Sequence, residues 1–481
     1  MTILKRALPA ILLLFLLSSC PWWHRDYDEI GPLGQGEFYA QNFKTRNYYK
    51  LKASLLAEGN FCEIWVENGS AISEVSARAF AARYDNFIRP KMLSAFSEEN
   101  FQLIDRGITH QFNDVLEYAN YLAGNNNNKL TILLLDIQDN YHVVNSPSYV
   151  AGYFYGGNFL EKGLIPGTRN YSNSRDMIYI DTYPGLRNEG SERAYATFAH
   201  ELQHLINFCT SVLIGRDRTM DLWIDEGLSS QAEYIYLEEN PRDKIDWFNR
   251  SDTIKKGNNF FVWDNHNEDM AILDEYATVY LFFRWLYLQA NTQLKATIFK
   301  EIITSNQHDY RAVTEAAIKI NSSWDDLGTL LRTWFAANYD PANENFGYKD
   351  DASLHGLKVH PIGGADIRLF PGEGVYSIIN GSANKTVTGN INYAGLKKNQ
   401  SPNTSSPFAE EMLLTYNTNL NLIGPSEPGS LTGIEPPSTS SVSRTLADDT
   451  KETGPFILDA RDVLGRGSDE EIFTFFKAKP K

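Results

Sequence analysis

The sequence predicts an α+β fold in which strands come first, helices follow, and short strands end the chain. Residues 37–69 alternate apolar and polar side chains, as strands do when one of their faces is buried. Residues 191–339 carry apolar side chains at helical spacing, and after Pro341 the pattern returns to short strands and turns. The chain has 481 residues, 42% of them hydrophobic, which is enough for two or three compact units.

The first twenty residues combine a basic start, an apolar block and a cysteine. Lys5 and Arg6 precede the apolar block, and Cys20 follows Leu17 and two serines. The ending LSSC resembles the lipobox of bacterial lipoproteins, whose cysteine is lipidated and becomes the first residue of the mature protein. We therefore expect residues 1–19 to be a signal peptide and lipidated Cys20 to attach the chain to a membrane. An ordinary signal peptide or anchor with an incidental cysteine is the alternative.

The expected location is the bacterial cell envelope. Pro21, rather than an aspartate, follows Cys20, which favours the outer membrane or cell surface over the inner membrane. The net charge of −16 argues against nucleic acid as a partner, because phosphates would be repelled. The sequence does not indicate an oligomeric state.

Two further cysteines, Cys62 and Cys209, are too few for a disulfide scaffold or a cysteine-based zinc cluster. An oxidising compartment would permit a bond between them. Cys209 lies in an apolar helical run, however, so we expect it to pack as a buried thiol.

Between the first strands and the helical part, the sequence predicts a helix and several more strands. Residues 73–96 have helical spacing, and residues 130–137 form an apolar run that is typical of a buried strand. Residues 148–160 and 175–185 indicate two short aromatic-rich strands, with a polar linker between them.

Residues 197–208, TFAHELQHLINF, contain two histidines four positions apart. On a helix His200 and His204 share one face, so their rings can bind one cation. Glu201 lies beside them, where it can take a proton from a metal-bound water. Ser191 is the expected N-cap of this helix. A single helical histidine would be an ordinary core residue, but the complete triplet in a chain with nine histidines favours a metal site.

A catalytic zinc site normally has three protein ligands and one position for water. Glu226, in DLWIDEGLSSQAEY, is the candidate third ligand. Glu233 lies two turns further on and is its competitor, or else accepts a hydrogen bond from a histidine. Asp225 is expected to point elsewhere and is the weaker candidate for such a hydrogen-bond partner. Gly227 is a poor residue for the middle of a helix unless close packing needs it, so we expect the stretch DEGLS to be the place where this helix meets the first one.

HELQH followed by LWIDEGLSSQAEY resembles the gluzincin metallopeptidases, in which the glutamate of a W-x-x-E-G helix completes a His/His/Glu zinc site. The hyicolysin family is the most similar group among them. The resemblance extends roughly over residues 131–339. It implies one Zn²⁺ per chain, bound by His200, His204 and Glu226. Glu201 would then be the general base.

The resemblance also implies an oxyanion donor and a substrate strand. The family's tyrosine matches Tyr276 in DEYATVYLFF, although a core aromatic is the alternative and Tyr280 and Tyr287 have similar spacing. His266 is a weaker second donor. The stretch AGYFYGGNFL would be the edge strand of the sheet, along which an extended peptide lies; an inner strand is the alternative. The candidate substrate-binding residues are Gly152, Tyr153, Phe154 and Tyr155.

The expected organisation is a zincin-like metallopeptidase domain between two smaller β-rich parts. A stretch near residues 424–454 is biased towards Ser, Thr, Pro and Gly and predicts a mobile loop. The expected parts are the signal peptide (1–19), an N-terminal β-rich segment (20–70), the metallopeptidase domain (71–345, with sheet and active-site helix in 71–210 and a helical lobe in 211–345) and a C-terminal β module (346–481).

These expectations describe a lipid-anchored zinc metallopeptidase that hydrolyses peptide or protein substrates through a metal-activated water. The sequence lacks the G-x-M-E-N type of motif with which gluzincin aminopeptidases hold a free amino terminus, and this favours an endopeptidase. Two rival hypotheses remain. One is a non-catalytic surface lipoprotein, an adhesin or scaffold, with the same fold, and the other is a metal-dependent hydrolase of a non-peptide amide.

Overall fold

The computed structural model describes most of the chain between residues 34 and 418, and three residues beyond it. Cys20, His266 and residues 424–454 lie outside the described residues, so the expectations for them are not addressed by the structure. None of the helices in the described part has both the length and the hydrophobicity needed to cross a bilayer. The described residues are 34–45, 47–97, 129–139, 141, 148–159, 171–214, 220–257, 260–261, 273–362, 369, 372–379, 391–418 and 456–458.

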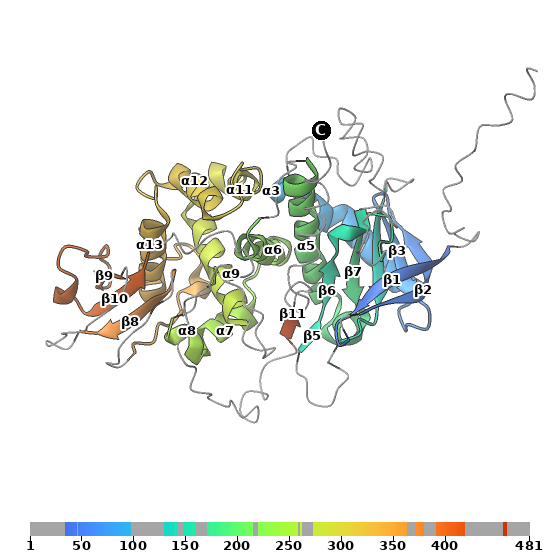
Figure 1. The fold of residues 1–481 in the computed structure, drawn as a ribbon, viewed down its shortest axis with the longest axis horizontal. Helices are drawn as coiled ribbons and strands as arrows, with labels where there is room; N and C mark the ends of the chain where they lie inside the picture. Colours follow the sequence, from blue (N-terminus) through green and yellow to red (C-terminus); the bar gives the residue numbers. More distant parts are fainter. Residues whose placement is uncertain are drawn as a thin grey trace, which may run out of the picture.

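A six-stranded mixed sheet forms one end of the molecule (Figure 1). Its strand order is β1-β2-β3-β4-β7-β6, with β3, β4 and β7 parallel and the other neighbours antiparallel. Because β3 pairs with β4, the first three strands belong to the same sheet as the strands that follow. The strands are β1 (Gln35–Asn42), β2 (Asn47–Glu58), β3 (Cys62–Glu67), β4 (Leu130–Leu135), β6 (Gly152–Phe154) and β7 (Met177–Asp181).

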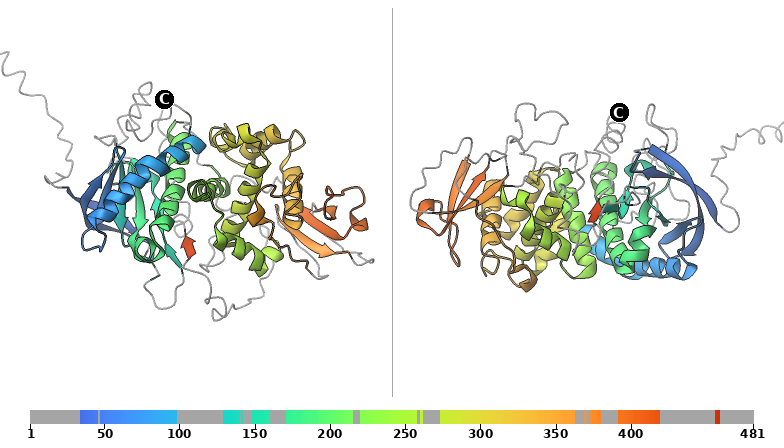
Figure 2. Two further views of the ribbon diagram at one scale, coloured as in Figure 1. Left: turned by 180° about the vertical axis from the view of Figure 1, so that it is seen from behind. Right: turned by 90° about the horizontal axis from the view of Figure 1, so that it is seen from below.

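Helices cover one face of this sheet, and the curl of β1 and β2 closes the other face (Figure 2). On the helical face Phe80 packs edge-on against Phe198, with ring centroids 5.5 Å apart. On the other face Phe38 packs edge-on against Trp65 at 5.1 Å. Both faces therefore bury apolar side chains, which accounts for the continuous apolar run of β4. The covering helices are α2 (Glu74–Arg83), α3 (Arg89–Phe96) and α5 (Ser191–Phe208).

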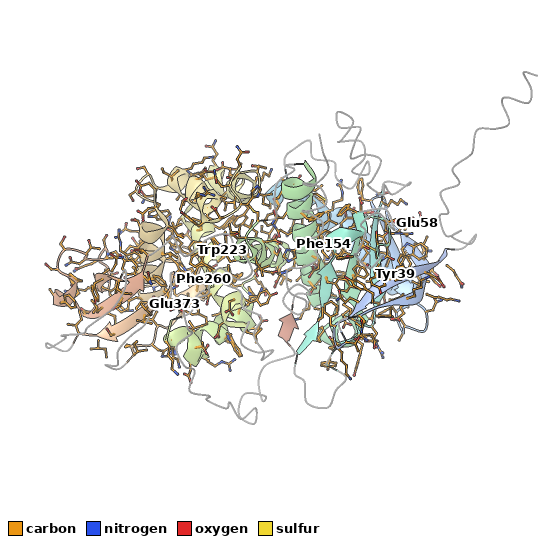
Figure 3. All side chains as sticks on the ribbon, viewed as in Figure 1. Tyr39, Glu58, Phe154, Trp223, Phe260 and Glu373 are labelled. Carbon is orange, nitrogen blue, oxygen red and sulfur yellow. The ribbon has the colours of Figure 1, made fainter. Side chains whose placement is uncertain are left out.

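The second part of the molecule is a group of helices around α9 (Leu273–Gln289). This helix is apolar on nearly all sides, which is typical of a helix with neighbours all round it. Trp223 and Phe260 lie among these helices (Figure 3), and Phe282 of α9 contacts both rings. The other helices of this part are α6 (Leu222–Leu237), α7 (Arg242–Arg250), α8 (Asp252–Lys255), α10 (Thr292–Lys295), α11 (Ile298–Ile303), α12 (Tyr310–Ile320) and α13 (Leu327–Tyr339).

Short strands follow the helices, as the sequence predicts. Three of them form a small sheet, in which the hydroxyl of Tyr376 on β8 (Gly374–Ile378) donates to the carbonyl of Phe335 on α13 at 2.7 Å. This hydrogen bond attaches the small sheet to the helical part. The strand β11 (Phe456–Leu458) pairs in parallel with β5 (Ser148–Val150), just before β6. The three antiparallel strands of the small sheet are, in order, β8 (Gly374–Ile378), β10 (Met412–Asn417) and β9 (Ile391–Leu396).

The fold class is confirmed as mixed α+β, with a curled sheet followed by many helices. Cys62 on β3 and Cys209 after α5 are separate buried thiols. The disulfide that an oxidising compartment would permit is therefore not formed, and Cys209 packs as expected. Burial raises the pKa of both thiols, so they stay protonated and unreactive at neutral pH.

Candidate metal centre

The helix α5 carries the HExxH segment across the helical face of the sheet. Gly190, with φ 93°, occupies the N-cap position, and no described side chain caps the helix there. The expectation that Ser191 is the N-cap is therefore wrong, because glycine tolerates the positive φ that the preceding turn requires. Glu192 in the first turn accepts a hydrogen bond from Arg83 at 2.5 Å and one from the Tyr236 hydroxyl at 2.8 Å. These contacts attach α5 to α2 and α6.

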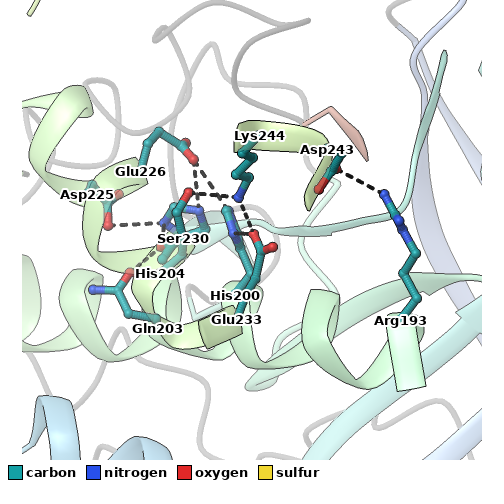
Figure 4. A network of polar contacts seen from close by, with 11 residues as sticks. Arg193, His200, Gln203, His204, Asp225, Glu226, Ser230, Glu233, Asp243 and Lys244 are labelled. Atoms are coloured by element: carbon teal, nitrogen blue, oxygen red, sulfur yellow. Dashed lines mark hydrogen bonds and ion pairs between the residues drawn. The ribbon is translucent and has the colours of Figure 1, made fainter. Parts of the chain in front are cut away.

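Three side chains from α5 and α6 converge where the two helices pack together (Figure 4). The Nε2 atom of His200 lies 3.4 Å from Glu226 Oε2, and the Nε2 atom of His204 lies 3.6 Å from the same oxygen. One ligand atom of each residue lies within 4.8 Å of the others. Among the described residues, this is the one such group of three side chains that could bind a metal.

The distances between these donor atoms fit a zinc ion. Zinc binds histidine nitrogen and carboxylate oxygen at about 2.0–2.1 Å, so two ligands of a tetrahedral ion are about 3.3–3.4 Å apart. The His200–Glu226 and His204–Glu226 separations are close to that edge length. The site also buries three acidic side chains, Glu201, Asp225 and Glu226, of which Glu226 is completely buried. A divalent cation would offset much of the cost of burying these charges together.

Glu233 fixes the orientation of His200. Its Oε1 atom lies 2.8 Å from His200 Nδ1 and 2.8 Å from Lys244 Nζ. Burial raises the pKa of Glu233, but the Lys244 ammonium and the hydrogen bond to His200 outweigh this and lower the pKa to about 2. The ionised carboxylate accepts a hydrogen bond from the protonated Nδ1 of His200. The unprotonated Nε2 is then the ring nitrogen that can bind a metal. In this geometry Glu233 is the partner of a candidate ligand, and Glu226 is the acid that joins the two histidines in the candidate metal-binding group.

Asp225 and Ser229 fix the orientation of His204. The Nδ1 atom of His204 lies 3.0 Å from Asp225 Oδ1 and 2.9 Å from Ser229 Oγ. Asn207 donates to the same Asp225 oxygen at 2.6 Å, and the Ser229 hydroxyl also contacts Gln203. The expectation that Asp225 points elsewhere is therefore wrong, and Asp225 is a partner of a candidate ligand, the weaker of the two possibilities that the sequence offered for it. Because α6 crosses α5 closely, Asp225 and Ser229, which lie one turn apart on α6, both reach His204.

Glu201 and Tyr276, the two candidate catalytic residues, are both buried near this cluster. Glu201 lies on α5 between the two histidines and is 2% exposed. Tyr276 lies on α9, and the Lys244 ammonium is 5.8 Å from the centre of its ring. The two competing tyrosines have other contacts. The Tyr280 hydroxyl donates to Asn240, and the ring of Tyr287 stacks on Phe299.

The predicted substrate strand lies at the end of the sheet, since β6 is the last strand in the order of described strands. Tyr153 stacks on Tyr179 with ring centroids 4.0 Å apart, and Phe154 packs on Phe208 at 5.6 Å. A Cβ atom on Gly152 would lie 3.0 Å from Thr197 of α5, so the strand and the helix are in close contact. The side chains of β6 are therefore buried, and a peptide would meet the backbone of this strand. Tyr155, which follows β6, is partly exposed and lies near Tyr48.

Gly227 packs against α9. A Cβ atom there would collide with the ring of Phe283 and approach Val279 to 2.9 Å. The expectation that the stretch DEGLS is where α6 meets α5 is confirmed, because Asp225, Glu226 and Ser229 of that stretch all contact His204 of α5. The close packing that requires a glycine is made with α9.

Gly227→Ala is expected to lower the free energy of unfolding by about 1–3 kcal/mol, because the added methyl overpacks the contact between α6 and α9. Urea denaturation followed by circular dichroism measures this change. Gly356→Ala is a matched control, since a Cβ atom at that position would meet no atom within 4 Å. Equal stability of the two variants would contradict the packing described here.

Several polar residues of the site belong to no motif and have no spacing that would mark them in the sequence. Lys244 lies on α7, in a helix that begins after Pro241 and matches no motif. Ser229, Ser230 and Gln203 are common residue types at unremarkable positions. Their contacts depend on how three helices cross, and spacing along one helix does not reveal that.

No protein-family model matches the chain. The chain is 28% identical over 329 residues to the neutral metalloprotease ShpI of Staphylococcus hyicus. The matched part is 67% of this chain and 65% of the relative, so the chain spans just under two thirds of the length of that protein. The matched part, at 329 residues, is longer than the region 131–339 over which we expected the resemblance to extend. The chain is thus similar to a metalloprotease, and its His200, His204 and Glu226 cluster fits a zinc site.

Proposed function

We propose that this chain is a zinc-dependent metallopeptidase that cleaves internal peptide bonds of peptide or protein substrates. The single observation that carries the proposal is the convergence of two imidazole nitrogens and one carboxylate oxygen at zinc-ligand spacing, from His200, His204 and Glu226. The similarity to a neutral metalloprotease supports the same class of reaction. We further propose that lipidated Cys20 holds the enzyme at the bacterial cell envelope.

Each part of the site has a task in this reaction. A zinc ion held by His200, His204 and Glu226 would supply Lewis acidity, which would activate the scissile carbonyl and the attacking water. Glu201 accepts a proton from the attacking water and later delivers it to the leaving amine. Glu233 and Asp225 hold the two imidazoles in the orientation described above. Glu226 supplies the one anionic ligand.

The edge strand β6 would orient the substrate. An extended peptide that pairs with an exposed strand edge is held through its backbone, whatever its side chains are. Because β6 packs directly on α5 through Gly152 and Thr197, a peptide on this edge would lie beside the helix that carries His200. Such binding suits an endopeptidase, since it requires no free terminus.

Tyr276→Phe is expected to lower kcat by about 10²-fold while the zinc content stays the same. In our proposal the Tyr276 hydroxyl donates to the developing oxyanion, a contact that contributes about 3 kcal/mol when it is well placed. Steady-state kinetics on a cleaved peptide measures the change. Tyr280→Phe is the control, because the Tyr280 hydroxyl donates to Asn240. An unchanged kcat for Tyr276→Phe would remove Tyr276 from the mechanism.

Digestion of an unbiased peptide library by the chain from Pro21 onward tests the proposed function. We expect internal cleavages that a chelator abolishes and added zinc restores. Removal of single residues from either end would indicate an exopeptidase. A protein that binds zinc but cleaves no peptide in the library would contradict the proposal and favour a binding role for the same site.

A further inference from the structure

Lys244 is a largely buried cation next to the candidate metal centre, and nothing in the mechanism above requires it. Its side chain is 13% exposed. Its ammonium group donates to Glu233 Oε1 at 2.8 Å and to Ser230 Oγ at 3.1 Å, and both of these residues lie on α6. The same ammonium lies 5.8 Å from the ring centre of Tyr276 and 5.6 Å from that of Tyr280, which lie on α9.

The two hydrogen bonds of Glu233 meet at a single oxygen. His200 Nδ1 and Lys244 Nζ both lie 2.8 Å from Glu233 Oε1 (Figure 4). The position of this oxygen decides how the His200 ring is held, and Lys244 is the cation that holds the oxygen. Without an ammonium group there, the carboxylate could rotate about its side-chain torsions, and the hydrogen bond to His200 would lose its fixed geometry.

The helix α7 attaches Lys244 to the other parts of the site. Trp247, one turn after Lys244, donates through Nε1 to Asp274 Oδ1 at 2.7 Å, and Ser251 donates to the same oxygen at 2.6 Å. Asp274 lies on α9, two residues before Tyr276. Asp243, the residue before Lys244, lies 3.3 Å from Arg193 of α5. The short helix α7 therefore contacts α5, α6 and α9, the three helices that carry the candidate ligands and the candidate oxyanion donor.

We infer that Lys244 is a positioning residue. It fixes the orientation of the His200 ring through Glu233, and it keeps the metal site and Tyr276 in a fixed position relative to each other. The role that Lys244 has towards Tyr276 rests on the proposed function. The role that it has towards His200 requires only that the cluster binds a metal. A partner that orients a ligand in this way typically changes metal affinity by about 10–100-fold when it is removed. Arginine at this position would keep the charge and the donors, whereas methionine would keep only the length of the side chain.

The test uses the full chain with Lys244→Met, Lys244→Arg and, as a control, Lys91→Met. Lys91 also pairs with an acid, Glu238, at 2.7 Å, but that acid is exposed and directly follows the last residue of α6. We expect Lys244→Met to weaken zinc binding about 10–100-fold in a chelator competition and to shift the visible absorption bands of the cobalt-substituted protein. Lys244→Arg should recover much of the affinity, and Lys91→Met should match the parent.

A double-mutant cycle separates positioning from general loss of stability. If Lys244 acts on His200 through Glu233, then Lys244→Met combined with Glu233→Gln should weaken zinc binding little more than the stronger single variant does. Additive losses, or parental zinc affinity and an unchanged cobalt spectrum in Lys244→Met, would overturn the inference.

If Lys244→Met does not fold, Ser230→Ala removes the second acceptor of the ammonium, and it must then weaken zinc binding for the inference to hold. Because these readouts need no substrate, the proposed peptidase activity can fail separately.

Discussion

Glu201→Gln will retain a full complement of zinc and will lose peptide-bond hydrolysis by a factor of about 10²–10⁴. Glutamine has nearly the shape of glutamate, so the packing of this buried side chain on α5 is kept. It cannot accept a proton from the attacking water, and the reaction loses its general base. Elemental analysis for zinc and the initial rate of casein hydrolysis measure the two effects on the same sample.

The control for this experiment is Glu192→Gln, which makes the same substitution in the first turn of the same helix. Glu192 contacts Arg83 and Tyr236 and lies outside the set of candidate ligands. The assignment fails if Glu201→Gln cleaves casein at the parental rate. It also fails if the variant loses its zinc, because Glu201 would then be a ligand.

Glu226→Ala is expected to abolish stable zinc binding, with a loss well beyond the factor of about 10–100 expected for Glu233→Ala. The Oε2 atom of Glu226 lies near the Nε2 atoms of both histidines, whereas Glu233 contacts the opposite nitrogen of His200. The comparison therefore decides which acid is the third ligand. Zinc content after dialysis and the dissociation constant from chelator competition are the measurements.

Thermal unfolding in excess chelator provides the control for this pair. If both variants unfold like the metal-free parent, the difference in zinc binding reflects ligation. Equal zinc affinity of the two variants, or weaker binding by Glu233→Ala, would exchange the roles that we assign to the two acids.

The sequence reveals the histidine pair because a helix fixes the spacing of its own residues. His200 and His204 share a face whatever the rest of the fold does, and the apolar surroundings predict the buried helix. The third ligand requires a second helix to cross the first, so the sequence offered Glu226 as a candidate but left Glu233 as its competitor. The error over Asp225 has the same cause, because the crossing angle decides which two positions of α6 face His204.

The strand order could not be read from the sequence either. Strands and their types follow from alternation and from apolar runs, but the parallel pairing of β3 with β4 joins segments separated by more than sixty residues. Gly227 shows the same limit within the helical part. The sequence indicates that something packs closely there, and only the structure identifies Phe283 as its neighbour.

A crystal structure of the zinc-loaded protein, with anomalous scattering recorded at the zinc absorption edge, tests the central claim most directly. We expect one strong peak per chain, about 2.0–2.1 Å from the Nε2 atoms of His200 and His204 and from a carboxylate oxygen of Glu226. A peak bound by other residues would contradict this account of the molecule, as would a zinc-soaked crystal with no peak between α5 and α6.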